Sequence, residues 1–118
     1  MSRARGNAMA NAFADYLRPW WPYAEATGSG RNGRDVTGTP GVAFEIKTAD
    51  DFKRDFKPTI WVAQAKANAA YAEPHPVVYL PRGVGARNMA NSLFILPAYW
   101  GMALLEGSGY APAPKETA

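Results

Sequence analysis

Apolar residues share one helical face near the start of the chain. They recur at the i, i+4, i+7 and i+8 spacing, which predicts an amphipathic helix over residues 7–18. The face consists of Met9, Phe13, Tyr16 and Leu17. Pro19 and Pro22 follow directly and end the helix, because proline lacks the amide hydrogen that a helix interior needs.

Three short segments of strand-like composition come next, separated by glycine-rich turns. The segments are WWPYAEATG (20–28), GRDVTG (33–38) and GVAFEIKT (41–48), and the turns between them are GSGRNG and TGTPG. Because the connections are short, consecutive strands should fold back on one another. We therefore expect an antiparallel meander.

The second half of the chain alternates helical and strand patterns. Pro58 suits the first turn of a helix, and the alanine-rich segment TIWVAQAKANAAYA continues it to about Tyr71. PVVYLP (76–81) and SLFILP (92–97) read as strands, the first of them buried, and AYWGMALLEG (98–107) reads as a core helix. The order α-β-β-β-α-β, followed by β-α, predicts an α/β protein with a mixed central sheet flanked by helices.

Chain length and hydropathy indicate one non-membrane domain. A chain of 118 residues is long enough to bury a core without disulfides or structural metal. We place the domain over residues 1–106 and expect 107–118, which has no apolar face, to be a flexible tail. No signal peptide is apparent, and the longest apolar run, 13 residues with Pro97 inside it, is too short for a membrane span. We expect a cytoplasmic protein.

Composition limits the metal chemistry. The chain has no cysteine and a single histidine, His75, which excludes thiolate-bound zinc, iron–sulfur centres and a histidine-rich site. Any metal must therefore bind oxygen ligands. The net charge of +3 permits nucleic-acid binding without demonstrating it.

The third strand segment carries the candidate chemistry. Side chains alternate along a strand, so Phe44 and Ile46 point one way, whereas Glu45 and Lys47 point the other. The turn TGTPG folds the preceding strand back, so that Asp35 can lie beside Glu45. Two converging carboxylates repel each other unless a divalent cation lies between them, and such hard oxygen ligands suit Mg²⁺ or Mn²⁺.

Two interpretations of these residues remain open. In the first, Asp35 and Glu45 hold the metal, while Lys47 orients or deprotonates an attacking water or offsets charge on a phosphate. Gln64, on the following helix, could reach the same site. In the second, the charged residues are the solvated face of an ordinary hairpin, because this spacing often arises by chance.

These segments together resemble the PD-(D/E)XK nuclease superfamily, and within it the small Holliday junction resolvase-like endonucleases of phages and archaea. The likeness runs over about residues 6–81 and includes GNAMANAFADYL, VAFEIKT and WVAQAKANA. It implies a restriction-endonuclease-like αβββαβ core with a C-terminal β-α extension. It also implies that Asp35 and Glu45 bind metal, that Lys47 is the catalytic lysine, and that Gln64 is the helix glutamine of the site.

The chain departs from the family's pattern at two positions. Ala10 stands where relatives often carry a first-helix glutamate, and Arg34 precedes Asp35 where proline is usual. The missing glutamate leaves open whether one or two metal ions bind. Glu25, on the first strand segment, is a candidate substitute.

The resemblance implies a Mg²⁺-dependent endodeoxyribonuclease that hydrolyses phosphodiester bonds in branched or double-stranded DNA, as a junction resolvase in recombination and repair. The alternatives are a nicking, flap or restriction-type nuclease of the same fold, and a non-catalytic DNA-binding module derived from it. Cations near the proposed site are candidates for phosphate contacts. They are Arg31, Arg34, Lys53 and Arg54.

The sequence also leads to expectations for the oligomeric state and the cellular location of the protein. Resolving a four-way junction takes two symmetric nicks, and one domain of this size has one site, so we expect a homodimer. The four tryptophans and the apolar segment within residues 82–105 suggest that this part of the chain supplies the interface. The implied location is a bacterial or phage-infected host cytoplasm, with no membrane partner.

Overall fold

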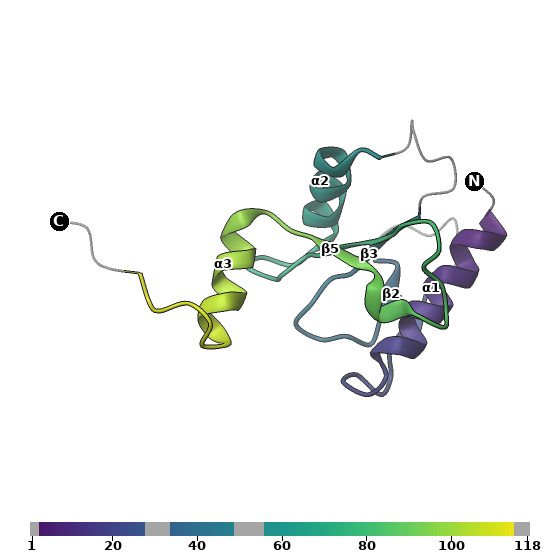
Figure 1. Ribbon diagram of the computed structural model, residues 1–118, viewed down its shortest axis with the longest axis horizontal. Helices are drawn as coiled ribbons and strands as arrows, with labels where there is room; N and C mark the ends of the chain where they lie inside the picture. Colours follow the sequence, from purple (N-terminus) through teal and green to yellow (C-terminus); the bar gives the residue numbers. More distant parts are fainter. Residues whose placement is uncertain (1–2, 28–33, 49–55, 115–118) are drawn as a thin grey trace.

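The computed structural model describes residues 3–27, 34–48 and 56–114. Within these ranges the chain forms an α/β structure with three α-helices, a three-stranded sheet and a separate two-stranded sheet (Figure 1). In chain order the elements are α1 (Arg3–Leu17), β1 (Glu25–Ala26), β2 (Val36–Thr37), β3 (Glu45–Thr48), α2 (Pro58–Asn68), β4 (Val77–Leu80), the 3₁₀ helix η1 (Met89–Asn91), β5 (Leu93–Ile95) and α3 (Ala98–Gly107). This order agrees with the expected one.

The three-stranded sheet has the order β3-β4-β5 and is mixed, as expected. Strand β3 runs parallel to β4, with Glu45 opposite Val77 and Lys47 opposite Tyr79. Strand β5 runs antiparallel to β4. Two parallel neighbours require a crossover connection, and α2 provides it.

Helix α1 covers one face of this sheet. The face predicted from the sequence is buried: Phe13 is fully buried and Leu17 is 3% exposed. Both belong to one core cluster with Phe44, which precedes β3, and with Val78 and Leu80 of β4. The helix forms because its apolar positions recur on one side, and it is held because that side meets the sheet.

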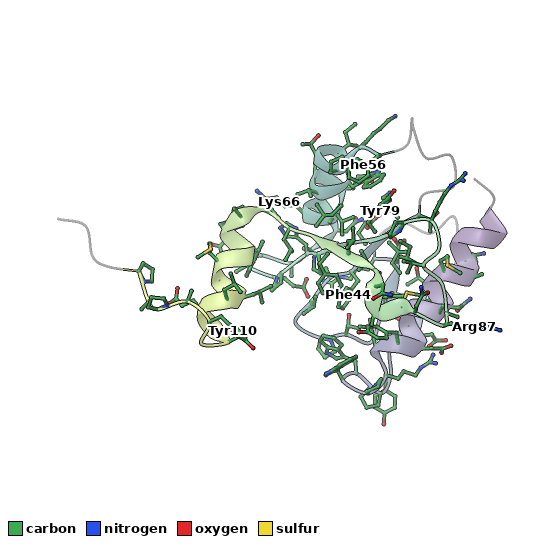
Figure 2. The ribbon with its side chains drawn as sticks, viewed as in Figure 1. Phe44, Phe56, Lys66, Tyr79, Arg87 and Tyr110 are labelled. Atoms are coloured by element: carbon green, nitrogen blue, oxygen red, sulfur yellow. The ribbon has the colours of Figure 1, made fainter. Side chains whose placement is uncertain are left out.

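Helix α2 packs on the opposite face of the sheet. Its buried residues Trp61 and Ala65 cluster with Val77, which alternates with the residues that face α1. Trp61 also stacks on Tyr79 with ring centroids 5.6 Å apart, and Phe56 meets Tyr79 edge-on at 5.1 Å (Figure 2). The sheet therefore lies between α1 and α2, and a separate hydrophobic cluster covers each of its faces.

The predicted three-stranded meander is wrong. Strand β1 pairs antiparallel with β2, Ala26 lying opposite Val36, but β2 does not pair with β3 in the described part of the chain. The cause is the hydrogen bonding of β3. The amide of Glu45 donates toward β4, to the carbonyl of Pro76 at 3.1 Å, whereas the amide of Ile46 donates to a side-chain carboxylate instead of to a strand.

The first expected strand is also shorter than predicted. The amides of Trp20 and Trp21 both donate to the carbonyl of Leu17 at 2.9 Å, so the chain turns there instead of extending. Two prolines nearby favour this turn, and only Glu25 and Ala26 reach the β1 pairing.

The turn between β2 and β3 requires a glycine. Gly38 has a φ of +77°, a region that other residues rarely adopt, and a Cβ atom there would lie 2.1 Å from the carbonyl oxygen of Tyr23. The close approach of these two backbones fixes where β2 ends. It therefore also fixes the position of the residue before β2, Asp35.

Helix α3 has the predicted bounds, but the prediction that it lies in the core is wrong. None of its residues is buried, and in Figure 1 it lies at the left of the view, beyond one end of the sheet, whereas α1 lies at the right. Its anchor is Trp100, whose Nε1–H donates to Nε2 of His75 at 3.2 Å. His75 is in a loop, as expected, but is 3% exposed. None of the helices in the described ranges has the length and apolar run needed to cross a membrane.

Candidate metal centre

Glu45 and Lys47 lie on the α2 face of the sheet, at its β3 edge. The predicted alternation is confirmed, since Phe44 and Ile46 pack into the core on the α1 side. Glu45 is only 8% exposed. The Nζ atom of Lys47 lies 3.6 Å from Oε2 of Glu45, so the lysine and the glutamate form an ion pair along one strand.

Asp35 reaches the same edge from the neighbouring two-stranded sheet. It directly precedes β2, and its Oδ2 accepts a hydrogen bond from the amide of Ile46 at 2.7 Å. That amide belongs to the residue between Glu45 and Lys47. One backbone hydrogen bond therefore brings Asp35 to the two charged residues that the sequence motif contains.

Both carboxyl groups resist ionisation in this position. Burial raises the pKa of Asp35 above its usual 3.8, and the smaller effects of the Ile46 amide and the Lys47 charge act in the opposite direction. Burial also raises the pKa of Glu45 above its usual 4.5, and the nearby charge of Asp35 raises it further. Lys47 and Asn68 only partly offset this rise. The two carboxylates thus lack a full compensating positive charge.

This arrangement fits a divalent cation with oxygen ligands. The described residues contain no group of three or more His, Asp or Glu side chains suited to holding a metal, and Glu25 is exposed on β1. Mg²⁺ needs no such group, because it commonly binds proteins through one or two carboxylates and keeps several waters. Asp35 and Glu45 are therefore the two residues that would hold a Mg²⁺ or Mn²⁺ ion.

The helix residue that contacts the site is Asn68. Its Nδ2 donates a long hydrogen bond, 3.5 Å, to Oε1 of Glu45. Gln64 lies one helical turn earlier and is exposed, and in the described part of the structure it makes no hydrogen bond to Asp35 or Glu45. The i, i+4 relation of Gln64 and Asn68 was the available sequence signal, since both residues share one face of α2.

The cations expected to bind DNA have different surroundings. Arg34 makes a bidentate ion pair with Glu73, its Nη1 lying 3.0 Å from Oε2, and this pair ties the start of β2 to the loop before β4. Arg34 thus helps to fix Asp35, and its role in phosphate binding stays a prediction. The other three candidates, Arg31, Lys53 and Arg54, lie outside the described residues.

Ala10 provides no ligand from the first helix. It lies partly buried in α1, on the opposite side of the sheet from Glu45 and Lys47, and its methyl side chain carries no oxygen. Within the described residues the site therefore has two acidic side chains, which favours one bound ion over two.

The raised pKa values predict how pH affects the metal-free protein. A carboxyl group whose pKa is raised by folding contributes stability below its unfolded pKa, and this contribution is lost as pH rises through the folded pKa. Glu45→Gln keeps the shape but cannot ionise. At about pH 4 we expect wild type and Glu45→Gln to have similar melting temperatures. At higher pH we expect the melting temperature of wild type to fall below that of the variant.

Thermal melting in EDTA across this pH range checks the prediction. Adding Mg²⁺ should raise the melting temperature of wild type more near neutral pH than in acid, because the ion competes with protons for the same oxygens. A difference between the two proteins that does not change with pH would contradict the raised pKa of Glu45.

Comparisons of this chain with protein-family models, curated proteins and solved structures found no match. The site contains the buried carboxylate of Glu45, the partly buried carboxylate of Asp35, one adjacent lysine and one amide side chain.

Proposed function

We propose that the protein is a metal-dependent DNA endonuclease that hydrolyses phosphodiester bonds. The observation that carries this proposal is the convergence of Asp35 and Glu45 beside Lys47, with both carboxyl pKa values raised by burial. An ordinary solvated hairpin face would keep these charges in water, where their pKa values would stay near the usual ones. The burial of Glu45 favours the site interpretation over the hairpin interpretation.

Each residue has a role that follows from its position. Asp35 and Glu45 would hold Mg²⁺ or Mn²⁺, which supplies Lewis-acid polarisation of the phosphate when bound. Lys47, paired with Glu45 but still about a quarter exposed, can hold a water molecule for in-line attack and place positive charge near the phosphate. Asn68 orients Glu45 through its amide.

The order of elements supports a restriction-endonuclease-like fold. A parallel β3–β4 pair joined by α2, with Asp35 at the second strand and Glu45 and Lys47 on the third, matches the αβββαβ arrangement of the PD-(D/E)XK superfamily. The main departure from that arrangement is that β2 does not pair with β3. Instead, the Asp35 carboxylate accepts a hydrogen bond from the Ile46 amide of β3.

We further propose that the substrate is branched DNA, with the protein acting as a Holliday junction resolvase in the cytoplasm of a bacterium or a phage-infected host. A nicking, flap or restriction-type nuclease would use the same three residues. A non-catalytic DNA-binding module is the second candidate, and one specific observation favours it: Ala10 offers no oxygen ligand, so the site has only two acidic side chains among the described residues.

One assay separates these candidates. Purified protein with Mg²⁺ or Mn²⁺ is incubated with a four-way junction, a flap and a linear duplex of matched sequence, and EDTA serves as the control. We expect paired nicks in the junction that EDTA abolishes. Preferential cutting of the flap or duplex would support the other nucleases, and binding without cutting in either metal would support the non-catalytic module.

A further inference from the structure

Three aromatic side chains form a cluster on the α2 face of the sheet. Phe56, which precedes α2, has its ring centroid 5.5 Å from that of Trp61 and 5.1 Å from that of Tyr79. Trp61 in turn stacks on Tyr79. We call these three residues the aromatic cluster. Figure 2 shows Phe56 and Tyr79 close together beside α2.

The aromatic cluster leaves one of its rings open to solvent. Trp61 is 8% exposed, as expected for a residue packed between a helix and a sheet, whereas Phe56 is 50% exposed. The contacts of Phe56 with the other two rings fix its position, and its exposed half remains able to contact another flat molecule. Phe56 is therefore the contact residue of the cluster, and Trp61 and Tyr79 support it.

The register of the sheet places the aromatic cluster next to the candidate metal centre. Lys47 of β3 is paired with Tyr79 of the parallel strand β4, and adjacent strands lie about 4.8 Å apart. Both side chains lie on the α2 face. Asn68, in the last turn of α2, bonds to Glu45. Phe56, at the other end of this helix, contacts Tyr79 instead. A group stacked on Phe56 would thus lie at the lysine end of the site.

An exposed ring beside a cation complements the two parts of a nucleotide. Every nucleobase has a π face that can stack on an aromatic side chain, and lysine attracts the phosphate next to it. Lys47 has 26% of its side chain exposed, and Lys57, directly after Phe56, is exposed. The surface is therefore complementary to the charge of a DNA strand and to the shape of its bases.

Base pairing decides which DNA can use this contact. In a continuous duplex the neighbouring bases cover both faces of each base, so a protein ring can stack only on a base that is unpaired or has been turned out of the helix. Turning out a paired base costs free energy, and the cost is least for a base that is already unpaired. An exposed ring at the site therefore favours DNA with an unpaired nucleotide.

We propose that Phe56 stacks on an unpaired base of the DNA strand whose phosphate lies at the candidate metal centre. This inference rests on the proposed function. It narrows the substrate to DNA in which a nucleotide beside the cut is unpaired, as in a flap, in a gap or at an opened branch point. Continuous duplex is then the poorer substrate, because a base must first leave the stack.

The test is a thermodynamic cycle between Phe56 and the bases. One DNA is a duplex with an internal gap that exposes a single strand of thymidines. The other has abasic sites in place of those thymidines, so its backbone charge is unchanged. Dissociation constants are measured by fluorescence anisotropy in EDTA, which prevents metal-dependent cleavage. We expect wild type to bind the thymidine gap about 5- to 100-fold more tightly than the abasic gap. Phe56→Ala should lose this preference, with its affinity for the abasic gap changed by less than about 2-fold.

Two further variants of Phe56 distinguish stacking from simple packing. Phe56→Tyr keeps a planar ring and should bind both DNAs like wild type. Phe56→Leu keeps an apolar cover over Trp61 but has no planar face, so it should behave like Phe56→Ala, and it decides the test if Phe56→Ala does not fold. Tyr71→Ala is the matched control, because Tyr71 is a fully exposed aromatic residue beyond the other end of α2.

Three results would overturn the proposal. They are equal binding of wild type to the two DNAs, an equal loss of affinity for both DNAs in Phe56→Ala, and a wild-type preference in Phe56→Leu. Cleavage is measured separately, with Mg²⁺ on the thymidine gap. A protein that cuts but shows no preference for bases would lose the stacking role and keep the nuclease activity. A protein with a preference that depends on Phe56, but with no cleavage of any DNA, would keep the stacking role and lose the nuclease activity.

Discussion

Asp35→Asn and Glu45→Gln should each lower the rate of Mg²⁺-dependent cleavage by at least about 100-fold while leaving DNA binding largely intact. The size follows from the position of the two groups, because even residues that only support a metal ligand cost about 10–100-fold when removed. Each substitution keeps the shape of the side chain and removes its charge. In Asp35→Asn the amide oxygen of the new side chain can still accept the hydrogen bond from Ile46, so the fold should persist.

Asp15→Asn is the matched control for these variants. Asp15 is an exposed residue of α1, paired with Arg18, and lies away from the β3 edge. We expect this variant to cut at the wild-type rate. Cleavage is measured on the preferred DNA substrate with saturating Mg²⁺, and binding is measured by fluorescence anisotropy in EDTA. If either site variant cut as fast as wild type, Asp35 and Glu45 would not be the metal ligands.

Local patterns in the sequence were sufficient to predict most elements. The face of α1 and the alternation around Glu45 follow from periods of 3.6 and 2, which depend only on neighbouring residues. Strand β4 was also predictable from neighbouring residues alone, because it is a short, continuous apolar run between two prolines. Strand alternation correctly predicted that Glu45 and Lys47 share one face, and the structure also brings Asp35 to them, although through its side-chain hydrogen bond to Ile46 and not through the expected strand pairing.

Three features could not be predicted, because each depends on tertiary contacts. Whether the Ile46 amide bonds to a strand or to a side chain depends on how closely β2 approaches β3, and the sequence does not encode that distance locally. Whether Gln64 or Asn68 reaches Glu45 depends on the rotation of α2, which the packing of Trp61 against the sheet determines.

The exposure of α3 is the third such feature. Its apolar composition predicts burial, because apolar side chains gain free energy on leaving water, yet none of its residues is buried. Composition does not distinguish a surface covered by the same chain from one covered by another molecule. The core prediction was therefore wrong for α3, because no described part of the chain packs over the helix closely enough to bury any of its residues.

Lys47→Ala should lower the cleavage rate by about 10²–10⁴-fold, the range that a positioned proton-transfer group contributes. Unlike the two acids, Lys47 should not be needed for metal binding, since an ammonium group cannot be a ligand. Its charge lowers the pKa of both Asp35 and Glu45. Removing it should therefore leave Mn²⁺ affinity unchanged or slightly higher at alkaline pH, where both carboxyls are ionised, and reduce it in acid.

Two further variants separate the possible roles of the lysine. Lys47→Arg keeps the charge but cannot give up a proton in this pH range, so partial activity in this variant would assign Lys47 to charge stabilisation, and none would assign it to handling the water. Lys66→Ala removes an exposed lysine in the last turn of α2 and should cut normally. Calorimetric Mn²⁺ titration of Lys47→Ala at alkaline pH is the deciding measurement. Much weaker binding there would mean that Lys47 organises the metal ligands, and the assignment of metal binding to Asp35 and Glu45 alone would be wrong.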